Sequence, residues 1–446
     1  MATLYQILAR FKDDFAHSKK GEERAQWFIY IILAVIVPFT SSKTSNLLRC
    51  LHTIFGFSHV SKRRFYTFMA SSKIPWDKLW ETTRGTVPEL LTQGRTLVAI
   101  DDYINPKTGK KIFGCHRFFD HAAKQNQSRY PWAQNVVAAG LLVKAKGRWA
   151  CLPLAHRFYH PKDEFKKQEI RVGKDKITFQ TKLDQSVDML TEVHKTYKEP
   201  MLCVADSWFG NNGLWAPVRK ELGDNINLLS RLRSNNNLFD LPATRKEGKR
   251  GRPPKYGALL GKTSELAATY RDQVKPLQVD LYGRIREVAV VDQIVMLKTL
   301  KCPVRVVWVY RKTTWVALFT TDLSLSVKQI IEYYGARWKI ESGFKELKQD
   351  IGSLETQCRN AHAVVNHLNF CMMATTLTWI YAMQLEKAPK RRHLVNGRAH
   401  FAFSDVRRHI TEAVLSEDFL RICTCESKSV INSIAQAAKA MLRMAA

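Results

Sequence analysis

The sequence predicts an α/β protein with a helical region at each end. Between residues 96 and 232, short apolar runs rich in β-branched residues alternate with helical patterns. Before residue 95 and after residue 386, apolar residues recur at helical spacing. Between residues 233 and 311, a basic loop rich in Gly and Pro precedes several strand-like runs. We therefore expect a central α/β core that a β-rich insertion interrupts.

The length of 446 residues is too great for one compact core. We expect five parts. They are a helical region at 1–95, the first part of the core at 96–232, the insertion with a basic arm at 233–311, the second part of the core at 312–385 and a C-terminal helical region at 386–446.

The charge balance indicates a polyanionic partner. Lys and Arg number 70 against 40 Asp and Glu, which gives a formal net charge of +30. Nucleic acid is the usual partner of such a chain, and an anionic membrane surface is the competing interpretation. The longest apolar run, residues 27–39, is shorter than the roughly 20 residues that cross a bilayer. We therefore expect a buried helix there, DNA as the partner and no membrane.

The cysteines indicate a reducing compartment. There are nine, an odd number, and they are scattered without a Cys-x-x-Cys pair. This pattern predicts a cytoplasmic protein.

Two segments predict DNA contact. Helical patterns at 44–54 and 58–69, joined through Gly56, have the order of a helix-turn-helix, with Ser58 as a cap. The second helix carries Lys62, Arg63 and Arg64. Simple packing of a helical hairpin is the alternative.

The basic arm contains Arg-Gly-Arg-Pro, with Arg250 and Arg252. Extended arginine side chains suit narrow minor grooves. A solvated basic loop is the alternative.

Asp101 and Asp206 each follow a short apolar strand pattern, at 96–100 and 201–205. The carboxyl ends of strands are where sites form in α/β sheets, so the two side chains could converge on a cation. The alternative is that each residue ends a strand or caps a helix.

A long helix is expected at 326–350, with Ser324 or Ser326 as its cap. Tyr334, Arg337, Glu341 and Lys348 fall within roughly 60° of one stripe of this helix. Apolar neighbours place the stripe at the border of the core, although a solvated face with ion pairs is the alternative. Carboxylates, Arg and Lys are the groups that two-metal phosphoryl transfer needs, and oxygen ligands suit Mg²⁺ or Mn²⁺.

The spacing Tyr-x2-Arg-x3-Glu-x6-Lys resembles the signature of DDE transposases from a large class of bacterial insertion sequences. Asp206 also stands in a D-x-x-F-G context, and a β-rich insertion precedes the helix with Glu341. The resemblance covers residues 96–385. It implies an RNase H-like catalytic core, cleavage of DNA ends that depends on Mg²⁺ or on Mn²⁺ as its substitute, and strand transfer.

The resemblance also implies roles for single residues. Asp101, Asp206 and Glu341 would be the catalytic metal ligands, with Asp102 as the alternative to Asp101. The order Asp101-Asp102-Tyr103 fits a D-x-Y pattern that favours Asp101, although the family often has Thr at the third position. Arg337 and Lys348 would grip phosphates, and Tyr334 would contact a phosphate or a sugar.

The expected function is that of a cut-and-paste transposase, a homodimer on double-stranded DNA at element ends and target, located at the nucleoid of a bacterium. The alternative is a non-catalytic or domesticated DNA-binding protein. A zinc hydrolase built on His156 and His160 is disfavoured because the segment lacks the Glu of a zincin helix.

Overall fold

The structure is a computed structural model that describes residues 2–38, 40–55, 61–120, 123–243, 254–393 and 400–415. Three sequence-based expectations lie outside these ranges. They are the turn and cap at Gly56 and Ser58, the arginines Arg250 and Arg252 of the basic arm, and the part of the expected C-terminal helical region that follows residue 415.

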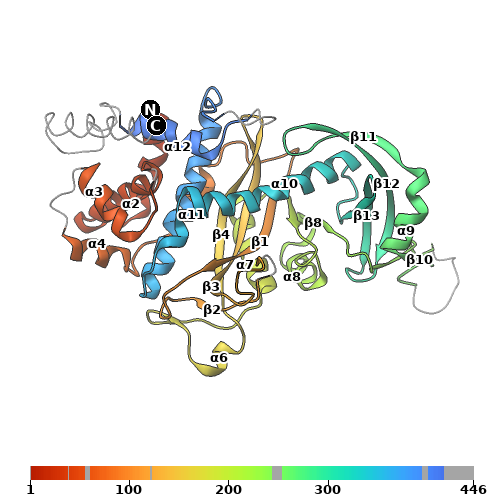
Figure 1. Cartoon of the computed structure of the whole chain (residues 1–446), viewed down its shortest axis with the longest axis horizontal. Coiled ribbons are helices and arrows are strands. Elements are labelled where there is room, and N and C mark those ends of the chain that lie inside the picture. The colour runs from red at the N-terminus through yellow and green to blue at the C-terminus, as the bar shows by residue number, and fades with distance from the viewer. Residues whose placement is uncertain are drawn as a thin grey trace.

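One large mixed sheet runs through the molecule (Figure 1). Its strands lie in the order β10-β9-β12-β13-β14-β8-β7-β1-β3-β2, with β4 paired to β3 and β11 paired to β12. The strands are β1 (Thr96–Pro106), β2 (Cys115–Arg117), β3 (Trp132–Ala145), β4 (Arg148–Tyr159), β7 (Met201–Ala205), β8 (Ile226–Arg231), β9 (Asn237–Phe239), β10 (Leu259–Lys262), β11 (Lys275–Asp280), β12 (Ile285–Leu297), β13 (Cys302–Arg311) and β14 (Thr314–Thr320). A separate small hairpin consists of β5 (Arg171–Val172) and β6 (Asp175–Lys176).

The described ranges contain twelve α-helices, so the α/β class expected from the sequence is confirmed. They are α1 (Ala2–Ala9), α2 (Lys19–Ile36), α3 (Thr44–Thr53), α4 (Lys62–Met69), α5 (Trp76–Gly85), α6 (Glu164–Lys167), α7 (Lys182–Tyr197), α8 (Asn212–Leu222), α9 (Thr263–Thr269), α10 (Val327–Lys345), α11 (Ala361–Gln384) and α12 (Phe403–Val414). Within these ranges, no helix combines the length and the apolar character that crossing a bilayer requires.

The centre of the sheet joins two kinds of pairing. Strands β4, β3 and β1 form an antiparallel meander, and β1, β7 and β8 are parallel. Helix α10 crosses one face of this centre, whereas α7 contacts β3 and β4 from the other side (Figure 1). The strands expected in the insertion continue the same sheet, because β14 pairs with both β8 and β13.

Strand β1 is longer than expected. The apolar pattern predicts a strand that ends at Ile100, but β3 pairs with β1 as far as Pro106 opposite Ala133. The parallel pairing with β7 does end at Ile100, opposite Ala205. Asp101 and Asp102 therefore lie within a strand, not after it, although they still follow the end of the parallel ladder.

Two helices differ from their expected bounds. The helix expected at 58–69 begins at Lys62, where the Ser61 hydroxyl accepts a hydrogen bond from the Arg64 N–H. The helix expected at 326–350 is α-helical only to Lys345, and a π-helical turn covers Glu346–Asp350. In this wider turn, the buried Glu346 carboxylate reaches Trp379 Nε1 at 3.2 Å and Arg148 at 3.5 Å.

The first prediction concerns Glu346. Burial raises the pKa of its carboxyl to about 7, opposed by Arg148, Trp379 and Lys339, whereas Asp350 raises it further. Because the folded pKa lies above the unfolded value of 4.5, the folded state loses stability as pH rises from 4.5 through 7. The free energy of unfolding of Glu346→Gln, measured relative to that of the native protein, should therefore increase by up to about 3 kcal/mol from about pH 5 to about pH 8.

Urea unfolding at the two pH values measures this difference. Glu355→Gln is the control, because the exposed Glu355 carboxylate pairs with Lys43 and its pKa is lowered. A stability difference for Glu346→Gln that does not change with pH would contradict the assignment.

Candidate active site

Asp101 and Asp206 share one face of the sheet. Alternate residues of a strand point to the same face, and neither strand has a bulge before its Asp. The residues of this face are Leu97, Ala99 and Asp101 of β1, and Leu202 and Val204 of β7 with Asp206 directly after it. The four apolar side chains pack with Ile330, Ala336 and Ile340 of α10 in one core cluster. The two carboxylates therefore end the apolar rows that α10 covers.

The parallel register brings the two residues next to each other. The ladder ends with Ile100 opposite Ala205, so Asp101 and Asp206 are the next residues on the two neighbouring strands. Their proximity is also electrostatic, because the charge of Asp206 raises the pKa of Asp101.

A tight turn fixes Asp206. Its Oδ1 accepts the backbone N–H groups of Trp208 and Phe209, each at 2.9 Å. A Cβ on Gly210 would lie 2.0 Å from the Ser230 hydroxyl, which itself donates to the Asp206 carbonyl at 2.7 Å. Phe209 is buried with 1% exposure. These contacts give the physical reason for the D-x-x-F-G pattern.

Arg337 of α10 joins two of the three carboxylates. Its guanidinium lies 3.0 Å from Asp101 Oδ2 and 2.9 Å from Glu341 Oε1. The Arg337 side chain is only 7% exposed, whereas that of Glu341 is 37% exposed. Arg337 is therefore turned toward the sheet, and Glu341 at the border of the core keeps contact with solvent.

The acidic charge at this point exceeds what Arg337 neutralises. Burial raises the pKa of Asp101 to about 7, although Arg337 lowers it, and the charge of Asp206 raises it further. Within the described ranges, no three His, Cys, Asp or Glu side chains are already spaced to hold a metal ion. The donors nevertheless fit a hard divalent cation, since all are carboxylate oxygens and the site carries surplus negative charge.

Asp102 points to the opposite face. Its Oδ2 lies 2.9 Å from Lys182 Nζ at the start of α7 and accepts a hydrogen bond from Asn135 Nδ2 at 2.8 Å. The Lys182 ammonium also lies over the rings of Tyr159 and Trp208. Asp102 is therefore already paired, and it is turned away from Arg337.

Tyr334 and Lys348 border the same region. The Arg337 guanidinium lies over the Tyr334 ring, with 5.6 Å to its centroid. Burial raises the pKa of Tyr334, and Asp206 raises it further against Arg337 and Arg231. Lys348, in the π-helical turn, donates to the Ile104 carbonyl of β1 at 2.9 Å. Arg337 and Lys348 of the signature thus contact β1 directly, and Glu341 is joined to Asp101 through Arg337.

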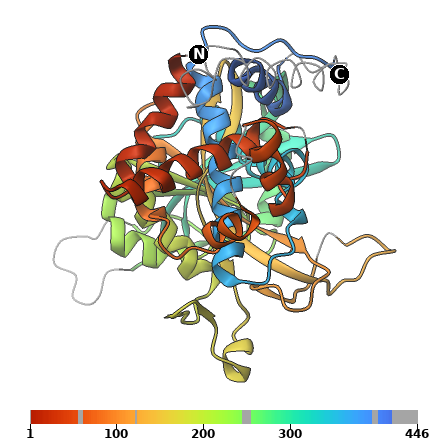
Figure 2. The same ribbon diagram turned by 90° about the vertical axis from the view of Figure 1, so that its left-hand side faces the viewer.

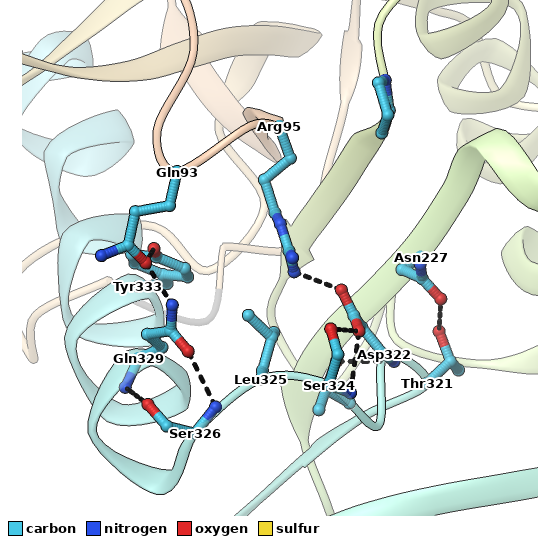
Figure 3. Close-up of polar contacts among 12 residues, drawn as sticks. Gln93, Arg95, Asn227, Thr321, Asp322, Ser324, Leu325, Ser326, Gln329 and Tyr333 are labelled. Atoms are coloured by element: carbon cyan, nitrogen blue, oxygen red, sulfur yellow. Dashed lines mark hydrogen bonds and ion pairs between the residues drawn. The ribbon is translucent and has the colours of Figure 1, made fainter.

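A polar network fixes the start of α10 (Figure 3). Ser326 is the N-cap, and its backbone N–H donates to Gln329 Oε1 at 2.8 Å in a capping box. Gln93, just before β1, accepts hydrogen bonds from both Gln329 and Tyr333. Arg95 pairs with Asp322, which follows β14. These contacts join the beginnings of β1 and α10 and so help to set where Glu341 lies.

The other sequence-predicted residues lie elsewhere. Lys62, Arg63 and Arg64 are exposed in the first turn of α4, and Arg64 pairs with Glu23. His156 and His160 are buried, and burial lowers their pKa to about 3 and about 4. His160 Nδ1 lies 2.9 Å from His116 Nε2, but the described residues include no three-ligand group around them.

Lys182, Asn135 and the Gln93–Asp322 network did not emerge from the sequence. Lys182 lies 80 positions from Asp102, and no local spacing links the two. One signal was available: the alternation Leu97, Ala99, Asp101 predicts that Asp101 and Asp102 face opposite sides.

Adjacent carboxylates at the carboxyl end of a parallel ladder, with Arg and Lys beside them, are the chemistry of enzymes that cut phosphodiester bonds. The family model described as DDE superfamily endonuclease matches residues 23–294, more than half of the chain, so the chain belongs to this family. The match includes Asp101 and Asp206 and ends before α10. Membership implies DNA as the substrate, and nucleases of this superfamily generally use divalent metals.

Two further comparisons add little. No curated protein matches this chain. The crystal structure of the NurA nuclease from Sulfolobus solfataricus aligns with 66% of this chain and 84% of its own, at 8% sequence identity and a TM-score of 0.22. So loose a superposition transfers nothing from one protein to the other.

The second prediction tests the cap of α10. Ser326→Ala removes the hydroxyl that accepts the Gln329 N–H, so we expect a loss of about 1 kcal/mol in the free energy of unfolding. Ser324→Ala is the matched control, because Ser324 donates to Asp322 and caps no helix. Urea unfolding measures the free energy of unfolding of both variants. Equal losses of this free energy would contradict the capping role of Ser326.

Proposed function

We propose that this protein is a cut-and-paste DNA transposase of the insertion-sequence class with an RNase H-like core. It would hydrolyse phosphodiester bonds at element ends and then join those ends to target DNA. The meander β4-β3-β1 followed by parallel β7 and β8 supports such a core. The observation that carries the proposal is the convergence of Asp101, Asp206 and the signature helix at one sheet edge.

Asp101, Asp206 and Glu341 would hold Mg²⁺, or Mn²⁺ in its place. The bound cation would supply an activated oxygen nucleophile and neutralise charge on the leaving oxygen. Arg337 and Lys348 would contact phosphate oxygens, and the exposed part of Tyr334 would contact a phosphate or sugar. Asp102 would take no part as a ligand, because Lys182 and Asn135 already occupy it.

The remaining parts would serve DNA binding and assembly. We propose that residues 1–95 bind element ends, that residues 312–385 complete the core begun at 96–232, and that residues 386–446 help two protomers pair. Three cations in the first turn of α4 support the first role. The positive end of the helix dipole disfavours them, and phosphate would relieve this repulsion.

A non-catalytic DNA-binding protein is the second candidate. One observation favours it, namely that Arg337 contacts both Asp101 and Glu341 within a region where the described residues include no ready metal-ligand group. Cleavage assays separate this candidate from the transposase.

The third prediction compares two neighbouring aspartates. Asp101→Asn should abolish cleavage of a plasmid that carries the gene's flanking DNA and should remove the rise in melting temperature on addition of Mg²⁺ or Mn²⁺. Asp102→Asn, on the opposite face, should keep the metal-dependent rise even if its starting stability is lower.

Loss of the rise in Asp102→Asn and not in Asp101→Asn would reverse the ligand assignment. Flank binding without metal-dependent cleavage by the native protein would favour the non-catalytic candidate.

The fourth prediction concerns α4. Replacing Lys62 and Arg63 with Gln should weaken binding to the flanking DNA. The slope of the logarithm of the binding constant against the logarithm of salt concentration should become shallower by about one unit for each phosphate that the variant no longer neutralises. The free energy of unfolding should not fall, because both side chains are exposed and no ion pair between described residues uses them. Fluorescence anisotropy at several salt concentrations measures the slope, and an unchanged slope would exclude α4 from the interface.

A further inference from the structure

The described parts of the connection between β1 and β3, residues 107–120 and 123–131, project from the body of the molecule (Figure 2). Its charge is strongly unbalanced, since Asp120 is its one acidic residue. The basic residues are Lys107, Lys110, Lys111, Arg117, Lys124 and Arg129. All of these except Lys107 are exposed. No ion pair between described residues uses Lys110, Lys111, Lys124 or Arg129, so these charges are left for an external anion.

The same loop exposes two aromatic rings. Phe119 is 42% exposed and Tyr130 is 55% exposed. Their centroids lie 5.3 Å apart at an interplanar angle of 60°. Arg117 donates to the Tyr130 carbonyl at 3.0 Å, and the Asp120 N–H donates to the Arg129 carbonyl at 2.8 Å. These two bonds join the segment that carries Phe119 to the segment that carries Tyr130.

The loop also begins beside the candidate active site. Lys348 donates to the Ile104 carbonyl at 2.9 Å, and Ile104 lies two residues before the end of β1. The loop leaves β1 at Pro106, five residues beyond Asp101, or about 17 Å along the strand. A DNA strand bound at Asp101 is therefore within reach of the loop.

We propose that this loop binds unpaired bases of a DNA strand, with Phe119 and Tyr130 stacking on the bases and the surrounding lysines and arginines contacting phosphates. Aromatic platforms in a basic surface are the means by which proteins hold single strands. The statement that this strand is the one cut at Asp101 rests on the proposed function, whereas the binding of unpaired bases by the loop does not.

Charge distinguishes this occupant from a protein partner. A second copy of the chain would bring the same unneutralised basic loop or another part of a chain of net charge +30. The projection around α6 shows the contrast (Figure 2), because Lys166, Lys167, Arg171 and Lys176 pair with carboxylates of the same projection. That projection therefore has no comparable surplus of unpaired basic side chains that could bind DNA.

The experiment uses the full chain in EDTA, so that binding is measured without cleavage. Fluorescence anisotropy follows a labelled oligothymidine strand and a duplex of the same length. The double variant Phe119→Leu/Tyr130→Leu should bind the single strand at least about tenfold more weakly and the duplex within about twofold of the native protein. The variant Phe119→Tyr/Tyr130→Phe keeps both rings and should retain the affinity for the single strand.

Tyr282→Asn is the control for loss of an exposed ring elsewhere. Tyr282 is 50% exposed in the β11–β12 turn, and Asn tolerates its φ of 60°. This variant should bind both probes as the native protein does. Thermal unfolding checks that every variant is folded.

Unchanged affinity of the double leucine variant for the single strand would overturn the proposal. An equal loss on both probes would also overturn it, because the loop would then act through phosphates alone. A change of oligomeric state by light scattering, without a change in strand binding, would assign the rings to self-association instead. Absence of cleavage by the native protein would count against the transposase and would leave the strand-binding result standing.

Discussion

The arrangement of the site depends on placing two like charges side by side in a half-buried position. The register of β1 and β7 makes Asp101 and Asp206 neighbours, and both end apolar rows that α10 covers. Burial, and then the charge of Asp206, raise the pKa of Asp101, so the arrangement needs a cation from the covering layer. Arg337 supplies it. Helix α10 must therefore lie on this face of the sheet with one particular side turned inward.

Two sets of contacts hold α10 in that orientation. At its start, the Ser326 capping box and the contacts to Gln93 join the helix to the residues that lead into β1. At its end, the π-helical turn buries Glu346 between Arg148 and Trp379, which belong to the β3–β4 hairpin and to α11. Between these ends, Ile340 packs on the same core cluster as the apolar rows. Glu341 thus has its position set by residues that do no chemistry.

The sequence predicted the parts of this site that depend on local pattern. The apolar run before Asp206 matches β7, and the spacing around Glu341 placed its helix and its inward stripe. The extension of β1 was missed because its partner, β3, begins 26 residues after β1 ends and because two aspartates interrupt the apolar run. The π-helical turn was missed for a similar reason, since it satisfies Glu346 through contacts that only the tertiary structure provides. Pairing of Asp102 with Lys182 likewise depends on α7 returning across the sheet.

The two adjacent aspartates of β1 lie on opposite faces of the sheet and have different partners. Asp102 has a complete ion pair, because Lys182 and Asn135 satisfy one of its oxygens in a partly buried position. Asp101 instead pairs with the Arg337 guanidinium, which also pairs with Glu341, and Asp206 adds a third carboxylate nearby. A single guanidinium cannot neutralise three carboxylates, so this face keeps negative charge that a divalent cation would offset. The opposite face keeps none, and the alternation of side chains along β1 is enough to produce the difference.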